Sequence, residues 1–270
     1  MPLVDLTSAF DQDACGGELP THISFSQLDL MIRCPEAWRQ RYLVGTRGPA
    51  TTALAVGSGV HAGIAAMYDL LRDKPTASKR ALVDTAEEHA IHTIAGIETT
   101  RDADDPNPTT ISLLNTYVEQ RPTHIRPVET EKRIEVVLPD SDIPLIGYVD
   151  VEAEHQLVEV KTSSRKVSSP TGAWRVQAWL YQAAIPKPVE WHVLVKTKTP
   201  TLLVSAELAA PYDPVVTAKA IGLASATLER IQRLYEERGP DEEWPVDGVV
   251  HPWACSLCDA RYACPVGAAA

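Results

Sequence analysis

The amino-acid sequence predicts an α/β protein in which a central mixed β-sheet is flanked by helices. Three observations support this fold class: apolar residues recur at helical spacing in the first part of the chain, at a spacing of two in the middle, and at helical spacing again near the end. We therefore expect a flexible lead at residues 1–22, followed by a single domain at 23–270. Its three parts are helical residues 23–125, a sheet core at 126–206, and a C-terminal helix with a loop at 207–270.

Four helical stretches are predicted in the first part of the domain. In the first stretch, residues 23–45, Ser24 and Ser26 are available as caps, and Cys34-Pro35 marks a break between two short helices. The apolar side of these helices should hold Leu28, Ile32 and Trp38. The other three stretches are residues 53–72, 78–96 and 109–120, the last opened by Asn107-Pro108.

The sheet core begins where apolar residues start to alternate, from residue 129. A first strand is expected where Ile134, Val136 and Leu138 alternate, and further strands are expected at residues 145–152 and 156–161. Their short connections favour an antiparallel meander. A loop at 162–172 then leads to a helix at 174–184 and to a strand pair at 190–197 and 201–206.

The last predicted helix starts at Asp213-Pro214 and ends at Gly239-Pro240. Its buried stripe should consist of Val216, Ala220, Leu223, Ile231 and Leu234. A loop with three cysteines follows it.

Length and composition are those of an ordinary globular protein. The 270 residues are 44% hydrophobic and 23% charged, which is enough apolar material for a sizeable core. The first twenty residues lack the basic and apolar segments of a secretory signal, and no apolar run approaches the length of a membrane span. Five cysteines in such a chain indicate the reducing cytoplasm, where spaced cysteines more often bind metals than form disulfides.

The formal net charge of -11 argues against a protein that coats nucleic acid, because neutralising phosphates needs clustered cations. It leaves room for a local basic channel beside an acidic metal site, since a bound cation offsets the carboxylates. The candidate cations for such a channel are Arg33, Arg39, Arg41, Arg47, Arg165 and Lys166.

Asp150 and the triplet Glu159-Val160-Lys161 form the first candidate site. Hydrolysis of a phosphodiester needs a divalent ion, and Mg²⁺ or Mn²⁺ prefers oxygen ligands. Carboxylates on neighbouring strands can share one ion, because strands lie about 5 Å apart. Glu159 and Lys161 share a strand face, so Lys161 can hold or deprotonate the attacking water and offset charge on the phosphate. The carbonyl of Val160 is a third candidate ligand, and His61 is a candidate nitrogen ligand.

These residues also have ordinary structural explanations. The triplet alone is compatible with a surface strand of alternating charge, although this strand is otherwise apolar and buried charges are costly without a partner. His61 is compatible with a hydrogen-bonded helix histidine. Gln177 and Tyr181 lie one helical turn apart and face the same way, as in any polar helix stripe.

The second candidate site is the set Cys255, Cys258 and Cys264, followed directly by Pro265. This spacing is typical of iron-sulfur ligation, which needs a fourth thiolate. Cys34, at the helix break, is a better candidate than Cys15 in the lead. A zinc site with four cysteines is the alternative, although such sites more often show two close pairs.

Together these residues resemble the RecB-like branch of the PD-(D/E)xK nuclease superfamily. In particular they resemble its iron-sulfur members: the AddB-type nuclease domains, the CRISPR-associated RecB-like nucleases and the stand-alone phage exonucleases. The resemblance covers nearly the whole chain. It rests on the family positions matched by His61, Asp150, Glu159, Lys161, Gln177 and Tyr181, and on Cys34, Cys255, Cys258 and Cys264.

The resemblance implies a restriction-endonuclease-like core that forms a single nuclease domain at residues 23–270, with a C-terminal iron-sulfur loop. It also implies a 4Fe-4S cluster, dependence on Mg²⁺ or Mn²⁺, and a role for Gln177 and Tyr181 in orienting the site or the DNA. Glu131 precedes the first expected strand. Family members often carry a glutamate nearby, but Glu131 is not included in the expected site.

The expected activity is that of an exonuclease on DNA ends, with single-stranded DNA passing the metal, in recombination, replication or repair in a phage or a bacterium. The chain has no Gly-Lys dipeptide and hence no Walker-type phosphate loop, so cleavage should be independent of ATP unless a partner supplies a motor. The alternatives are the nuclease subunit of a helicase complex, a DNA-binding or adaptor protein with a cluster and no catalysis, and a zinc-stabilised scaffold.

Overall fold

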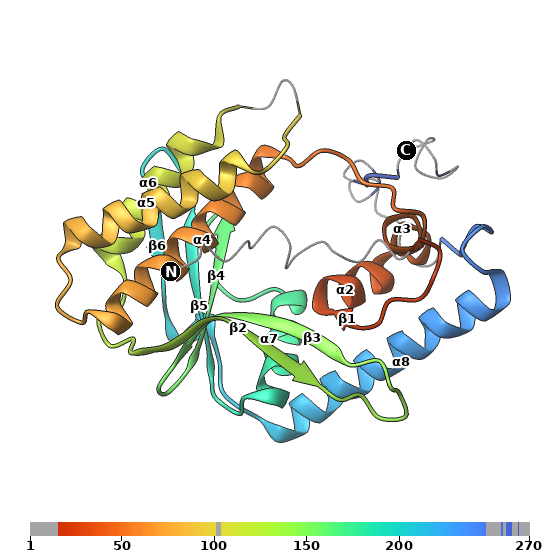
Figure 1. Cartoon of the computed structure of the whole chain (residues 1–270). Coiled ribbons are helices and arrows are strands. Elements are labelled where there is room, and N and C mark those ends of the chain that lie inside the picture. The colour runs from red at the N-terminus through yellow and green to blue at the C-terminus, as the bar shows by residue number, and fades with distance from the viewer. Residues whose placement is uncertain (1–15, 101–103, 247–254, 256–257, 261–263, 265–270) are drawn as a thin grey trace. The chain divides into compact units, whose positions relative to one another are not determined.

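The computed structural model describes residues 16–100, 104–246, 255, 258–260 and 264 (Figure 1). The chain divides into two compact units. Among the described residues, unit 1 contains 49–100, 104–134 and 148–213, whereas unit 2 contains 16–48, 135–147 and the residues from 214 onward. Strands 127–136 and 145–153 each run from one unit into the other. The domain boundaries expected from the sequence remain a prediction.

Three helices of unit 1 pack against one another: α4 (Thr52–Asp73), α5 (Lys79–Ala95) and α6 (Pro106–Gln120). Each begins after a residue whose side chain accepts a hydrogen bond from a free backbone N–H of the first turn, as a good N-cap does. The three helices predicted between residues 53 and 120 are thus confirmed. The start of α6 was predicted wrongly, because Asp105 is the cap and Pro106 the first-turn proline, in place of Asn107-Pro108.

The strands of unit 1 form a mixed sheet, as predicted. Its strands are β2 (Pro127–Val136), β3 (Leu145–Ala153), β4 (Leu157–Ser163), β5 (Val189–Val195), β6 (Thr201–Leu203) and β7 (Ala209–Ala210). β2 pairs with β3, and β3 is antiparallel to β4, which confirms the antiparallel sense predicted for that second pair. β4 and β5 are parallel and are joined through α7 (Gly172–Ala184), while β6 and β7 pair with β5 in the antiparallel sense. The strand expected at 201–206 stops at Leu203, ahead of the short 3-10 helix η2 (Ala206–Leu208).

The two faces of the sheet are covered by different helices. Val158 and Val160 of β4 pack into the core formed with α4, α5 and α6. Leu157 packs with Trp191 and with Ala178 of α7 on the other face. Because side chains alternate along a strand, Glu159 and Lys161 are directed to the same face as Leu157.

Helix α4 is also long and apolar enough to cross a membrane, the one such helix in the part of the chain that the structure describes. The expectation that no segment approaches a span was therefore wrong for α4 by length and composition. Its apolar residues Val60, Ile64 and Met67 are buried against α5 and α6. The apolar character of α4 is thus explained by its place in the core of unit 1.

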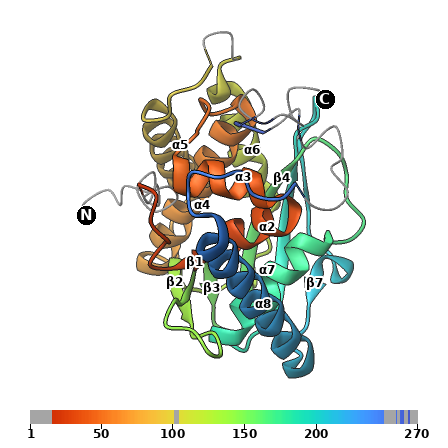
Figure 2. The same ribbon diagram turned by 90° about the vertical axis from the view of Figure 1, so that its right-hand side faces the viewer.

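Unit 2 contains strand β1 (Ile23–Ser24) and the helices α2 (Phe25–Arg33), α3 (Pro35–Arg39), the π-helix η1 (Gln40–Val44) and α8 (Pro214–Arg238) (Figure 2). β1 pairs in parallel with the first residues of β3, and α2 contacts α8. The helix break at Cys34-Pro35 and the cap at Ser24 are confirmed.

Two apolar residues of unit 2 were assigned wrongly to its buried side. Ile32 is 49% exposed, and Leu223 of α8 is 42% exposed. Ala224 and Leu228 are buried in α8 instead, so its inward stripe is rotated slightly from the predicted one. The helix ends as predicted at Gly239, whose positive φ of 65° suits glycine.

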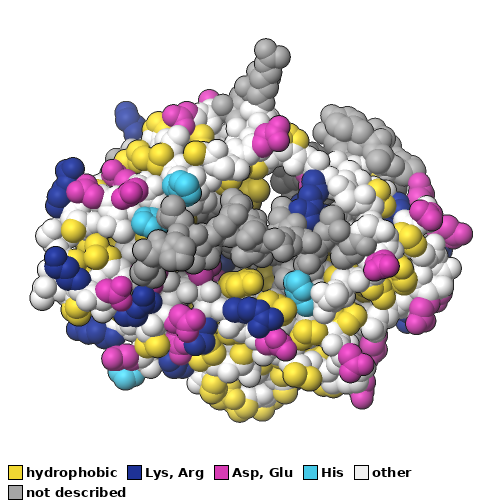
Figure 3. All heavy atoms as spheres, viewed as in Figure 1, with side chains coloured by type: hydrophobic (Ala, Val, Ile, Leu, Met, Phe, Trp, Pro, Cys, Tyr) yellow, Lys and Arg dark blue, Asp and Glu magenta, His cyan; other side chains and the backbone are white. Residues whose placement is uncertain are grey.

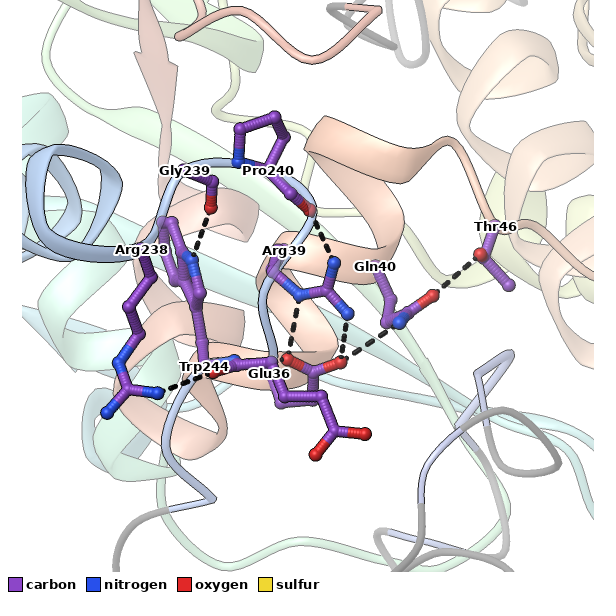
Figure 4. Close-up of polar contacts among 9 residues, drawn as sticks. Glu36, Arg39, Gln40, Thr46, Arg238, Gly239, Pro240 and Trp244 are labelled. Carbon is purple, nitrogen blue, oxygen red and sulfur yellow. Dashed lines mark hydrogen bonds and ion pairs between the residues drawn. The ribbon is translucent and has the colours of Figure 1, made fainter.

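A buried carboxylate links the two ends of unit 2 (Figure 4). Glu36 is 3% exposed, and its two oxygens accept hydrogen bonds from Arg39 at 2.6 and 2.8 Å, from Gln40 at 2.9 Å and from the backbone N–H of Trp244 at 2.7 Å. The ring of Trp244 stacks on Trp38, with centroids 5.4 Å apart. The segment after α8 is therefore held against α3 by both polar and aromatic contacts.

The same network corrects one expectation about DNA binding. Arg39 is 4% exposed and is committed to Glu36, so it cannot line a basic channel. Arg33 and Arg41 form ion pairs with Asp29 and Asp259, each at 3.0 Å. On the face shown in Figure 3, acidic and basic side chains are interspersed among the described residues. Any nucleic-acid path must therefore be local.

Two glycines in helices should respond in opposite ways to replacement by alanine. A Cβ on Gly63 of α4 would lie 2.7 Å from the carbonyl oxygen of Ala86, so Gly63→Ala should destabilise the protein by about 1–3 kcal/mol. A Cβ on Gly222 of α8 meets nothing within 4 Å, so Gly222→Ala should stabilise it by about 0.5–1 kcal/mol. Urea denaturation of both variants checks the signs, and an equal effect at the two positions would contradict the close packing of α4 on α5.

The Glu36 network should make stability depend on pH. Burial alone would raise the pKa of Glu36, but the hydrogen bonds from Arg39, Gln40 and Trp244 outweigh it and hold that pKa below its ordinary value of 4.5. The stabilisation is therefore complete above pH 4.5 and is lost as the pH falls through the lowered folded-state value. Glu36→Gln should cost about 2 kcal/mol at pH 7, because hydrogen bonds to a charged group are lost. Thermal unfolding at pH 7 and at lower pH should show the two proteins converging under acid conditions, and a constant difference would contradict this account.

Candidate active site

The site in unit 1 is built around Asp150 of β3. Its Oδ1 lies 3.0 Å from Nδ1 of His61, on α4, and its Oδ2 accepts a hydrogen bond of 2.6 Å from the backbone N–H of Val160, on β4. Burial would raise the pKa of Asp150, but the charge and hydrogen bond of His61 outweigh it, so the pKa is lowered. Asp150 is thus an ionised carboxylate with both oxygens held in place.

Glu131 of β2 joins this pair. The ligand atoms of His61, Glu131 and Asp150 all lie within 4.8 Å of one another. The backbone of Glu131 has a positive φ of 46°, which is uncommon for a residue with a side chain and is typical of functional sites. Burial, and then the charge of Asp150, raises the pKa of Glu131 to about 8.

Glu159 and Lys161 of β4 form an ion pair beside this group. Oε2 of Glu159 accepts a hydrogen bond of 3.0 Å from Nζ of Lys161, and the side chain of Glu159 is 1% exposed. Burial and the charge of Asp150 raise the pKa of Glu159 to about 7. Burial would lower the pKa of Lys161, but the charges of Glu159 and Asp150 outweigh it and raise that pKa. Lys161 is therefore held as a cation.

The cluster has the composition of a site for a divalent cation. One oxygen of Glu131 and one of Glu159 are buried and have no hydrogen-bond partner among the described residues, which is costly unless a cation neutralises them. Asp150 and His61 complete a set of oxygen ligands with one imidazole, which suits Mg²⁺ or Mn²⁺ better than a thiophilic metal. The residues present therefore fit a hard divalent ion.

His61 has the electrostatics of a ligand that shares a proton with its neighbour. Burial would lower the pKa of His61, but the charge of Asp150 and the hydrogen bond to it raise the pKa to about 8. A metal ion that binds His61 must displace this proton, because only the neutral ring is a ligand.

Gln177 and Tyr181 of α7 lie on the sheet face that carries Glu159. Nε2 of Gln177 donates a hydrogen bond of 2.9 Å to the hydroxyl of Tyr181. Burial, and then the charge of Glu159, raises the pKa of Tyr181 well above its ordinary value, so the hydroxyl stays neutral. The pair neighbours the acidic cluster and is not among the three residues whose ligand atoms converge.

The four cysteines of the second candidate site belong to unit 2, and none of them forms a disulfide with another described residue. Burial is the main cause of the raised pKa values of Cys34 and Cys258, and part of the shift comes from the proximity of Cys264 to both and of Cys34 to Cys258. The backbone N–H of Cys258 donates to the carbonyl of Cys255 at 3.1 Å. The structure thus brings the early cysteine to the C-terminal set, whereas Cys15 lies outside the described residues.

Comparison with known proteins identifies the family. A family model of the PD-(D/E)XK nuclease superfamily matches residues 22–265. The chain belongs to the PD-(D/E)XK nuclease superfamily. The protein is therefore a nuclease and hence a hydrolase. Members of the superfamily use divalent metal ions, and the group of His61, Glu131 and Asp150 is where such an ion could bind.

Solved structures of other proteins also show similarity to this chain. One is a protein from Eubacterium rectale, named provisionally as an exonuclease, which is 14% identical with a TM-score of 0.58; the match covers 96% of this chain and 92% of that one. Another, SSO0001, is 14% identical with a TM-score of 0.41, over 93% of this chain and 88% of that one. No curated protein matches the chain. The mixed sheet flanked by helices is consistent with a restriction-endonuclease-like core.

Glu131 is the member of the cluster that was left out of the site predicted from sequence. Strand β2 also carries Glu129 and Glu135, and their spacing gives no reason to choose among the three. The positive φ at Glu131 helps decide which carboxylate enters the site, and no sequence pattern reports it. β2 also starts at Pro127, so Glu131 lies within the strand and does not precede it.

Proposed function

We propose that the protein is an exonuclease that hydrolyses phosphodiester bonds at the ends of single-stranded DNA, with Mg²⁺ or Mn²⁺ and without ATP. The observation that carries this proposal is the acidic cluster of unit 1, in which Glu131 and Glu159 keep unpaired buried oxygens next to Asp150 and His61. The provisional name of the Eubacterium rectale relative favours an exonuclease over an endonuclease.

In this proposal the residues of the cluster have two tasks, holding the ion and supplying a positive charge. His61, Glu131, Asp150 and Glu159, with the carbonyl of Val160, would hold the ion, which would polarise the phosphate and lower the pKa of a bound water. Lys161, fixed by its ion pair with Glu159, donates a hydrogen bond to the attacking water or to the phosphate and offsets the charge that grows there.

Gln177 and Tyr181 position the site in this proposal. Their mutual hydrogen bond fixes a neutral hydroxyl near Glu159, which is suited to orienting that carboxylate or the DNA. Neither residue is proposed as a metal ligand.

We further propose that Cys34, Cys255, Cys258 and Cys264 hold a 4Fe-4S cluster. The proximity of Cys34 to Cys258 and Cys264 supports this assignment, because it brings an early thiol to a spacing typical of iron-sulfur ligation. The ion pair of Arg41 with Asp259, at 3.0 Å, holds the loop beside Cys258 to η1. A cluster here would be structural, closing a loop over most of the chain. A four-cysteine zinc site remains the alternative.

We place the protein in the cytoplasm, where thiolates persist, and in recombination, replication or repair of phage or bacterial DNA. Recombination or replication proteins are the expected partners. The second candidate function is the nuclease subunit of a helicase complex, because the chain has no Walker-type loop of its own. A DNA-binding adaptor without catalysis is the third, and the unpaired carboxylates argue against it.

Removal of a single cluster residue should abolish cleavage and leave the fold intact. Asp150→Asn removes a charged ligand but keeps an oxygen for the N–H of Val160, and Lys161→Ala removes the cation. Each should lower kcat with Mn²⁺ by more than about 100-fold, since even residues that only support metal ligands contribute 10–100-fold.

The assay uses end-labelled single- and double-stranded DNA, with EDTA as a blank and circular dichroism to verify folding. Glu154→Gln is the matched control, because Glu154 is a carboxylate that lies 59% exposed just after β3. Wild-type rates in both site variants would refute the assigned site, and cleavage in EDTA would refute the metal.

The cysteine assignment predicts colour. Anaerobically purified protein should be brown and should contain about four irons per chain, and Cys258→Ser should lose both properties because one of four ligands is removed. Cys15→Ser should keep them. Iron and zinc are counted in all three proteins; one zinc per chain without iron would establish the zinc site, and iron that is retained in Cys258→Ser would show that the ligand set is wrong.

A further inference from the structure

A groove of about 530 Å³ lies in unit 1, and none of the residues of the acidic cluster (His61, Glu131, Asp150, Glu159 and Lys161) lines it. It is formed by the first turns of α4 and α6 and by the turn between β5 and β6, and α6 contacts both α4 and β6. Its lining combines apolar groups, hydroxyl groups and two ammonium groups. Its lining includes Ala53, Val56, Pro108, Ser112, Lys196 and Lys198.

The two lysines of this groove are available to a ligand. Neither ammonium group makes a hydrogen bond or an ion pair with a residue that the structure describes, whereas Lys132, Lys161 and Lys187 each pair with a glutamate. Partial burial of Lys196 lowers its pKa, and no neighbouring acid offsets this effect. An anion in the groove would offset the free-energy cost of partly burying the Lys196 ammonium group.

The helix ends at the groove are already capped. The carboxylate of Asp105 accepts the N–H of Asn107 at 3.0 Å, and the hydroxyl of Thr51 accepts the N–H of Leu54 at 3.2 Å. The cationic character of the groove therefore comes from Lys196 and Lys198 and not from the helix termini.

The groove adjoins the acidic cluster along two elements. On α4, Val56 lines the groove and His61 follows five residues later, which is about 7.5 Å along a helix. On the sheet, the N–H of Lys196 donates to the carbonyl of Ser163 at 2.7 Å, two residues beyond Lys161. One extended strand of a polymer could reach both places.

We propose that this groove binds the sugar-phosphate backbone of single-stranded DNA next to the bond that is cleaved. Lys196 and Lys198 contact phosphates, the hydroxyl of Ser112 donates a further hydrogen bond, and the exposed apolar side chains of Ala53 and Pro108 pack against a sugar or a base. A cationic rim over apolar surface matches the alternating chemistry of a nucleotide strand. The cavity has the size of a small-molecule site, which admits a nucleotide or two and excludes a duplex. The inference rests on the proposed nuclease function.

The test compares Lys196→Ala/Lys198→Ala with Lys74→Ala. Lys74 is an exposed lysine at the opposite end of α4, so its variant removes a surface cation away from the groove. All proteins carry Asp150→Asn so that the DNA is bound but not cleaved. Binding of labelled single-stranded DNA is followed by fluorescence anisotropy across a salt series. The double variant should bind about tenfold more weakly, and the slope of log K against log salt should shrink by about 1.4, which is two phosphate contacts at about 0.7 each. Lys74→Ala should match its parent.

A second measurement separates this inference from the nuclease proposal. With Asp150 restored and Mn²⁺ present, the double variant should lose about tenfold in kcat/KM on long single strands and should keep the parental rate on thymidine 5′-p-nitrophenyl phosphate, which is too short to reach the groove. Equal binding by the double variant and its parent would overturn the groove, as would an equal loss in Lys74→Ala. A protein that cleaves nothing but shows the binding difference would refute the nuclease proposal and leave the groove standing.

Discussion

The hydrogen bond from the backbone of Val160 to Asp150 is the contact on which the site depends. It fixes a carboxylate of β3 to β4 at the point where Glu159 and Lys161 project, so the positions of three functional side chains are set by one link between neighbouring strands. That link also confines three acids to a space with one lysine and one histidine, and the raised pKa values of Glu131 and Glu159 are the result. The fold therefore places these carboxylates close enough to disfavour one another's ionisation, and a bound cation would offset that effect.

The parallel pairing of β4 with β5 extends this organisation in two directions. The crossover through α7 places Gln177 and Tyr181 over the face that carries Glu159. The same pairing carries the chain on to Lys196 at the edge of the groove. An antiparallel meander alone would supply the carboxylates but neither the Gln177–Tyr181 pair nor Lys196. The parallel pairing of β4 with β5 is therefore what places these residues near the site.

Periodicity in the sequence was sufficient to predict most elements, because most helices and strands bury one face against neighbouring elements of their own unit. It failed where burial is decided by a neighbour and not by the element itself, as at Ile32 and Leu223, which are apolar but exposed. Pairs within one strand or one helix turn, such as Glu159 with Lys161 and Gln177 with Tyr181, could be grouped from spacing. Glu131 and the arginine partners could not, because they depend on a backbone twist and on contacts between distant segments.

The glycines on either side of His61 in sequence determine how closely helix α4 packs against α5. Gly59 and Gly63 stand two residues before and two after His61, on the opposite side of α4, and a Cβ on either would come within 2.7 Å of an atom of α5. Helix α4 is thus packed closely against α5 and cannot move further toward it, so His61 cannot withdraw from Asp150. The distance between His61 and Asp150 is thus limited by two residues that have no side chain and lie on the other side of the helix.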